Sequence, residues 1–181
     1  KKRCFWVGNN PLMIEYHDKE WGRPSYEDRH LFEMLTLEGA QAGLSWETVL
    51  NKRENFRKAF NNFNIQKIAK YKSKDFKCLM NNPGIIRNRL KIESTISNAK
   101  ITLEIQKEYG SLSKYLWDII GGKPLPQIKN LTRKNIPAKT KESDLMSKTL
   151  KKRGFRFVGS TICYAFMQAV GMVNDHTIEC D

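Results

Sequence analysis

The sequence predicts an all-α fold. Apolar residues recur at helical spacing along most of the chain, and capping residues precede several of these stretches. No stretch shows the apolar–polar alternation of a half-buried strand. With 181 residues, 40% of them hydrophobic, the chain is long enough to bury one substantial core. We expect residues 1–181 to form a single unit, in which 25–171 make the helical core and 1–24 and 172–181 flank it.

Two helices are expected in the first third of the chain. Ser25 and Asp28 have the spacing of a capping box, which would open a helix running to about Ala42. Ser45 can cap the next helix. That helix would direct four apolar side chains toward the core: Trp46, Val49, Leu50 and Phe56.

Further helices are expected at 65–71, 75–80, 86–109, 112–120, 143–152 and 160–170. Turn residues at 81–84 separate the helix at 75–80 from the helix at 86–109. Glycines follow the helices at 86–109 and 112–120 and end them. Three prolines make 121–141 an extended connection. The last two helices are joined by a short turn at 154–159.

The charge balance favours a polyanionic partner. Lys and Arg number 32 against 19 Asp and Glu, which gives a net charge of +13. Such an excess is typical of nucleic-acid binding, although a lysine-rich proteome is an alternative source. No apolar run approaches the ~20 residues that span a bilayer, and no signal peptide is recognised. We therefore expect a cytosolic protein, without membrane contact, whose four cysteines are reduced.

Glu38 occupies a position where the helical pattern calls for an apolar side chain. Leu31, Met34 and Leu35 fall on one face of the first predicted helix, and Glu38 follows at i+7. A glutamate that faces the interior must be paired, protonated or used, because burying an unpaired charge is costly. The alternative is that the helix has already turned, so that Glu38 lies on the surface.

The turn at 154–159 has the features of a phosphate-binding hairpin. It is bounded by Gly154 and Gly159, and Ser160 and Thr161 lie in the first turn of the following helix. The free N–H groups and positive dipole end of that helix form an anion site. Basic side chains surround it: Lys151, Lys152, Arg153 and Arg156. This is the arrangement of a helix-hairpin-helix that grips DNA phosphates without reading sequence. An ordinary corner with a solvated basic face is the alternative.

Four residues of metal-ligand type lie at the two ends of the chain: Cys4, His17, His176 and Cys180. Two thiolates and two imidazoles make a tetrahedral zinc set, and four protein ligands would make the site structural. His176 and Cys180 share a face if the tail is helical. Four unrelated residues are the alternative. The remaining candidates are assigned elsewhere, His30 to the surface and Cys78 and Cys163 to buried positions within helices.

Aromatic residues flank Glu38 in the sequence, namely Trp6, Tyr16, Trp21 and Trp46. Such a cluster is usually part of a core. Aromatic faces also stack on bases and attract cations, while a carboxylate accepts hydrogen bonds from a base's amino group. Together with the positive charge and the predicted hairpin, the cluster suggests an enzyme that extrudes a base from DNA.

Six stretches carry a resemblance across the whole chain: RCFWV at 3–7, YHDKEWG at 16–22, LEGAQAGLSW at 37–46, GIIRNR at 84–89, KKRGFRFVG at 151–159 and NDH at 174–176. In these stretches the chain resembles the bacterial 3-methyladenine DNA glycosylase I family of the helix-hairpin-helix superfamily. The resemblance implies a helix-hairpin-helix glycosylase fold with one structural zinc joining the N- and C-terminal segments. It also implies a bacterial, cytoplasmic monomer that acts on double-stranded DNA containing alkylated bases.

The resemblance also assigns roles to residues. It implies that Cys4, His17, His176 and Cys180 bind the zinc, and that Glu38, Tyr16 and Trp46 hold the methylated base, with Trp6 and Trp21 near them. Gln41, Gly43 and Leu44 belong to a turn that would enter the gap left by the extruded nucleotide. Thr161 stands where bifunctional relatives carry a catalytic lysine, so the implied enzyme is monofunctional and hydrolytic.

Two departures and two alternatives accompany this hypothesis. Met13 stands where an aromatic is expected, and Asp175 lies near an aspartate used by many members of the superfamily, with no role assigned to it here. A non-catalytic helix-hairpin-helix DNA-binding module is the main alternative function, and a helical RNA-binding protein is another.

Overall fold

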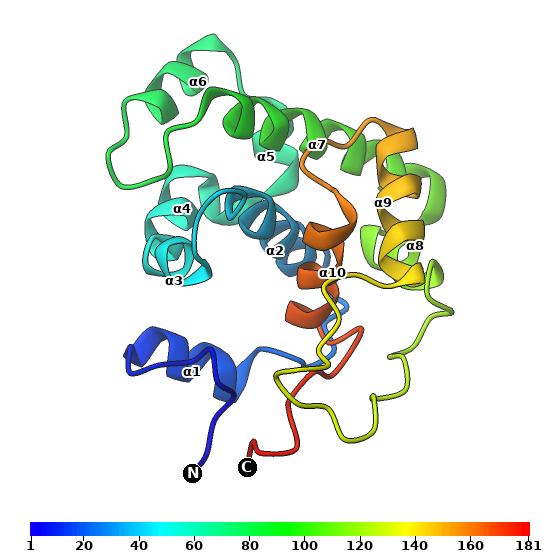
Figure 1. Ribbon diagram of the computed structural model, residues 1–181. Helices are drawn as coiled ribbons and strands as arrows, with labels where there is room; N and C mark the ends of the chain where they lie inside the picture. Colours follow the sequence, from blue (N-terminus) through cyan, green and yellow to red (C-terminus); the bar gives the residue numbers. More distant parts are fainter.

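The computed structural model describes residues 1–181 and contains helices joined by turns and loops, with no strand. The all-α prediction is therefore confirmed. In chain order (Figure 1), the elements are α1 (Pro11–Lys19), α2 (Asp28–Ala40), α3 (Trp46–Asn51), α4 (Arg53–Ala59), the short 3-10 helix η1 (Asn61–Phe63), α5 (Ile65–Ala69), α6 (Ser73–Met80), α7 (Arg89–Tyr109), α8 (Leu112–Asp118), α9 (Lys141–Arg153) and α10 (Ser160–Ala169). None of these helices is both long and apolar enough to cross a membrane.

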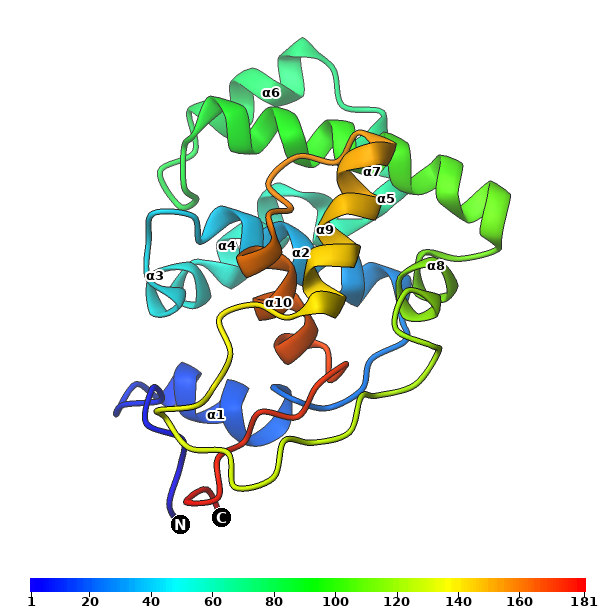
Figure 2. The same ribbon diagram turned by 45° about the vertical axis from the view of Figure 1, so that its right-hand side comes forward.

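Helices α2 and α10 pack against each other at the centre of the molecule. The long helix α7 crosses above them with α5 and α6, whereas α1 lies below them beside both chain ends (Figures 1 and 2). The connection 119–140 descends from α8, passes near the chain ends and returns to α9 (Figure 2). One cluster of 39 buried residues, from Cys4 to Val173, forms the core, so both end segments contribute to it.

The start of α2 differs from the predicted capping box. The helix begins at Asp28, and no side chain caps its N-terminus. The Asp28 carboxylate instead accepts hydrogen bonds from the backbone N–H groups of Leu112 and Ser113, at 3.0 and 2.8 Å. The Ser25 hydroxyl lies 2.7 Å from Nδ1 of His30. The prediction was wrong because Asp28 satisfies the free N–H groups at the start of α8, a contact between distant parts of the chain.

Three larger differences separate the observed helices from the expected ones. Helix α1 was not predicted, although the side chain of Asn10 caps it and Pro11 occupies its first turn, both common helix starts. The helix expected after Ser45 is divided into α3 and α4 at Lys52, where ψ is 0°. Helix α7 starts three residues later than expected, because the Asn88 side chain caps it.

The two cysteines assigned to helix interiors have different environments. Cys163 is completely buried on α10, as predicted. Cys78 is exposed on α6, so that prediction was wrong. Helix α6 buries only Leu79 of its eight residues, and its position at the edge of the molecule leaves the Cys78 face in solvent.

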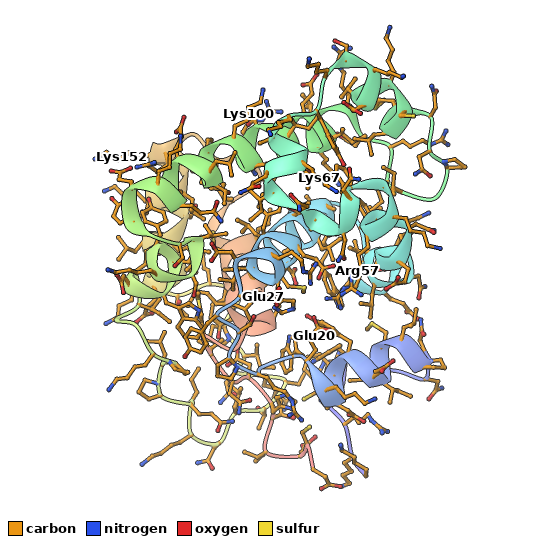
Figure 3. The ribbon with its side chains drawn as sticks, turned by 180° about the vertical axis from the view of Figure 1, so that it is seen from behind. Glu20, Glu27, Arg57, Lys67, Lys100 and Lys152 are labelled. Carbon is orange, nitrogen blue, oxygen red and sulfur yellow. The ribbon has the colours of Figure 1, made fainter.

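A chain of ion pairs fastens the end of α1 to the rest of the molecule. Arg53 on α4 donates two hydrogen bonds to Glu20, both 2.7 Å long, and one of 3.1 Å to Glu33 of α2. Arg57 donates to Glu33 at 2.6 Å. In Figure 3, Glu20 and Arg57 face each other across the space between α1 and α4. Removing one partner of a buried pair leaves an uncompensated charge, so this network holds α1 in a defined position.

Candidate active site

A pocket of about 420 Å³ opens between α1, the C-terminal end of α2, the start of α3 and α10. This volume lies in the range of small-molecule sites. The pocket is largely aromatic and apolar, with a few polar groups. Its wall is formed by Phe5, Trp6, Met13, Tyr16, Trp21, Glu38, Gln41, Ser45, Trp46, Glu47, Ile136, Ala165 and Gln168. The structure thus brings together Glu38 and all four predicted aromatics, and it adds Met13 to the wall.

Glu38 lies inside the protein, so the first of the two positions that its helical pattern left open is the one observed. Its side chain reaches the pocket, the residue is only 5% exposed, and it makes no hydrogen bond or ion pair within the protein. Burial raises the pKa of its carboxyl group from 4.5 to about 8. At neutral pH the pocket therefore holds a mostly protonated glutamic acid with unused hydrogen-bonding capacity.

Four aromatic rings surround this carboxyl group and contact each other. Trp6 meets Trp21 edge to face, with ring centroids 5.0 Å apart, and Tyr16 lies 5.3 Å from Trp46. Burial, and then the neighbouring charge of Glu38, raises the pKa of Tyr16 well above its ordinary value. The buried indole N–H of Trp46 has no partner. The rings offer flat apolar surfaces to a planar, cationic ligand.

The segment 41–44 follows α2 at the mouth of the pocket. Gln41 lines the pocket, Gly43 adopts a left-handed φ of +81°, and Leu44 is 41% exposed. An exposed leucine on a tight turn is available to another molecule. Ser45 then caps α3 by accepting from the backbone N–H of Thr48 at 3.2 Å, which orients Trp46 in the first turn.

The turn 154–159 joins α9 to α10 and contacts the last turn of α2. A Cβ atom on Gly39 would lie 3.2 Å from Cβ of Phe157, so the glycine permits this close approach. Gly159 precedes α10, and a Cβ atom there would meet nothing within 4 Å. The Ser160 hydroxyl contacts Asp144 at 2.5 Å, whereas Thr161 is exposed. The N–H groups at the start of α10 therefore open to solvent beside Gly159.

The four predicted metal ligands converge into one cluster, in which the ligand atoms lie within 4.8 Å of one another. Sγ of Cys180 lies 3.3 Å from Nε2 of His17 and 3.4 Å from Nδ1 of His176. The tail after Ala169 is not helical, and a turn brings His176 and Cys180 together.

The environment of the cluster suits metal binding. The other ring nitrogen of His17 lies 2.8 Å from the Asp18 carboxylate, and that of His176 lies 3.0 Å from the Trp21 carbonyl oxygen. These acceptors place the imidazole proton away from the cluster and leave a lone pair facing it. A divalent metal ion fits this donor set.

Several site residues could not be found from the sequence. Gln168 and Ile136 line the pocket but belong to no recognisable pattern.

Asp175 is 2% exposed, and its carboxylate accepts from Tyr164 at 2.5 Å and from Gln168 at 3.0 Å. Asp175 therefore orients a pocket side chain and does not itself line the pocket. His30 is partly buried beside Glu20 and lies outside the metal cluster.

Comparison with known proteins places this geometry in a family. The family model for methyladenine glycosylases matches residues 6–181. The DNA-3-methyladenine glycosylase of Haemophilus influenzae is 48% identical over 179 residues, which cover 98% of this chain and 96% of the relative. The chain belongs to the methyladenine glycosylase family.

Two solved structures of 3-methyladenine DNA glycosylase I show the same fold. A crystal structure that is 49% identical in sequence superposes with a TM-score of 0.95 and covers 99% of this chain and 98% of its own. A tyrosine-to-phenylalanine variant of a second such enzyme, in complex with 3-methyladenine, is 34% identical with a TM-score of 0.94 and covers 99% and 96%. Methyladenine glycosylases thus share this helical framework across nearly the full chain.

The burial of Glu38 should make stability depend on pH. The folded state keeps the Glu38 proton up to a pKa of about 8, whereas the unfolded chain loses it near 4.5. Stability is therefore lost as pH rises between these values, by roughly 1.4 kcal/mol per pH unit. We expect Glu38→Gln to raise the unfolding temperature, by a margin that grows from about pH 5 to pH 8. Thermal unfolding followed by circular dichroism measures this. The exposed Glu104→Gln is the control, and a pH-independent margin would contradict the assignment.

Proposed function

We propose that this protein flips 3-methyladenine out of alkylated double-stranded DNA and hydrolyses its glycosidic bond. The observation that carries the proposal is a buried carboxyl group without a partner, Glu38, enclosed by aromatic rings in a base-sized pocket. Membership of the methyladenine glycosylase family supports the same reaction. A non-catalytic DNA-binding module has no use for such a pocket, so we favour the enzyme.

The positive charge of the lesion explains how the pocket selects it. Methylation at N3 makes adenine cationic within DNA, and aromatic walls attract a flat cation. A cation beside Glu38 lowers the pKa of the carboxyl group, which then ionises and accepts a hydrogen bond from the exocyclic amine. Neutral adenine has no charge with which to ionise Glu38. Tyr16 and Trp46 would stack on the base, and Trp6 and Trp21 would close the wall behind it.

The reaction needs little acid catalysis because the cationic base is already a good leaving group. The bond between C1′ and the base nitrogen breaks, its electron pair stays with the base, and neutral 3-methyladenine departs. Water adds to C1′ of the oxocarbenium-like sugar and gives a proton to solvent. Thr161 offers no amine for a Schiff base, so we infer a monofunctional enzyme without lyase activity.

Two segments would hold the DNA around the pocket. Helices α9 and α10 with the turn 154–159 would act as a helix-hairpin-helix, in which Gly154 and Gly159 let the backbone approach a phosphate and Ser160 and Thr161 supply N–H groups. The segment 41–44, with Gln41, Gly43 and Leu44, would fill the gap left by the flipped nucleotide. Exposure of Leu44 and the open space at Gly159 support these roles.

We further infer that Cys4, His17, His176 and Cys180 hold one structural zinc. Such an ion joins residues 1–24 to 172–181, so that 1–181 works as one unit around the core 25–171. It also fixes Trp21, whose carbonyl oxygen accepts from His176 and whose ring lines the pocket. We further propose that the protein acts as a monomer.

The proposed reaction predicts the release of 3-methyladenine from methylated duplex DNA. The rate of 3-methyladenine release, measured by chromatography of the free bases, should exceed the spontaneous rate. No strand cleavage by a lyase step should accompany it. Glu38→Gln should lower kcat/KM about 10- to 100-fold, since a hydrogen bond to a charged group contributes about 1.5–3 kcal/mol. Glu104→Gln should keep full activity. Release at only the spontaneous rate by the unmodified protein would refute the enzyme.

Substitution of Gly159 should weaken DNA binding while leaving the pocket intact. Gly159→Asp places a negative charge where a phosphate would approach, and the open space there accommodates its side chain. We expect at least about tenfold weaker binding to an abasic duplex, with unchanged binding of free 3-methyladenine. Gly159→Ala separates crowding from repulsion and should have a smaller effect. Equal loss of both kinds of binding would indicate misfolding.

Elemental analysis of the purified protein should find about one zinc per chain, as a four-ligand site requires. Cys180→Ser should reduce the zinc content and the unfolding temperature together, because metal binding stabilises only the folded state. The exposed Cys78→Ser is the matched control and should change neither. A fully folded, equally stable protein without metal would contradict the structural role.

A further inference from the structure

Helix α7 binds the end of α2 through a lysine ammonium group. Nζ of Lys91 donates to the carbonyl oxygens of Ala40 and Ala42, at 2.9 and 2.8 Å. Carbonyl groups at the end of a helix have no partner within the helix, and they attract positive charge. Lys91 thereby fixes the conformation in which the chain leaves α2, just where the segment 41–44 begins.

The same helix binds the turn 154–159 through a buried amide. Oδ1 of Asn98 accepts from the backbone N–H of Arg156 at 3.1 Å, and Nδ2 donates to the Arg156 carbonyl oxygen at 3.2 Å. The Arg156 guanidinium also donates to the carbonyl oxygen of Leu90, at 3.0 Å. The next residue, Phe157, adopts a left-handed φ of +56°, which is costly for a bulky side chain. Asn98 holds the backbone beside this strained position.

The two contacts are aligned on α7. Lys91 and Asn98 are seven residues apart, or about two helical turns, so they lie on one face of the helix about 10 Å apart along its axis. Between them, Gly39 of α2 meets Phe157 of the turn. Helix α7 therefore sets the distance and angle between the segment 41–44 and the turn 154–159.

We propose that Lys91 and Asn98 are positioning residues for base excision. Lys91 holds the segment 41–44 in the shape that enters the duplex, and Asn98 holds the turn 154–159 in the shape that receives a phosphate. Neither residue lines the aromatic pocket. The inference rests on the proposed function. It adds that α7 joins the turn 154–159, which would bind a phosphate, to the segment 41–44, which would enter the duplex.

Substitutions of Lys91 and Asn98 should therefore have different effects on kcat and on DNA binding. Without Lys91, the protein still reaches the DNA, but the segment 41–44 is no longer held for insertion, so kcat falls. Without Asn98, the phosphate site is distorted, so KM and the Kd for DNA rise. Binding of free 3-methyladenine, which needs only the pocket, stays unchanged in both variants.

The test uses Lys91→Met and a duplex that carries a tetrahydrofuran abasic analogue next to 2-aminopurine. Fluorescence of 2-aminopurine rises when its stacking is disrupted, and it reports insertion without any chemistry. We expect Lys91→Met to bind this duplex with nearly unchanged Kd, to lose most of the fluorescence rise, and to release 3-methyladenine about 10- to 100-fold more slowly, as misplacement by about 1 Å does elsewhere. Lys91→Arg keeps a donor pair and should restore most of both signals.

Lys100→Met is the matched control, since Lys100 lies on the same helix but points into solvent (Figure 3) and makes no ion pair. It should behave like the parent protein. Asn98→Ala should raise the Kd for the abasic duplex about tenfold while kcat at saturating DNA changes less. The inference would be overturned if Lys91→Met gave the same fluorescence rise as the parent protein, or if the parent protein gave no rise. Loss of free-base binding in parallel with the loss of the fluorescence rise would also overturn it. Absence of 3-methyladenine release by the parent protein would instead overturn the proposed function.

Discussion

The structure depends on one constraint: a carboxyl group, Glu38, is buried among aromatic rings with no partner of its own. Helix α2 carries it inward on an otherwise apolar face, and α7 and α10 pack against that helix. The opposite wall belongs to α1, which would be loosely attached without help. Ion pairs of Arg53 with Glu20 and Glu33 hold one end of it, and the proposed zinc at the cysteine–histidine cluster would hold the chain segments around it. These contacts set the position of α1, and with it one wall of the pocket.

Recognition and stability are in conflict at this position. An unpaired carboxyl group in an apolar site destabilises the fold, and the protein avoids most of that cost by keeping Glu38 protonated. The same feature would make the site responsive to charge, because a cationic base would supply the missing counter-charge. In the proposed contacts with DNA, rigid helices hold the two segments that would touch the duplex, 41–44 and 154–159. Lys91 and Asn98 connect those segments at a distance from the base.

The sequence was most informative where local chemistry decides the structure. Helical spacing predicted α2, α7, α9 and α10, and the same spacing left an interior and a surface position open for Glu38, which the structure decides. It failed where distant contacts override local ones: Asp28 caps α8 and not its own helix, and Cys78 faces solvent because α6 lies at the edge. The family resemblance named the metal ligands and the aromatic wall, which spacing alone left open. Gln168, Lys91 and Asn98 contact partners that only the fold brings near, so no sequence pattern marked them.

The most direct test of this account is the ionisation of Glu38 itself. The protein, labelled with 13C in glutamate side chains, can be titrated by NMR, with Glu38→Gln identifying the signal. We expect the Glu38 carboxyl group to titrate near pH 8 in the free protein. Binding to duplex DNA with a cationic nucleotide analogue at the lesion position should shift this pKa downward, toward its ordinary value. A free-protein pKa at the ordinary 4.5, unaffected by the cation, would contradict the central claim.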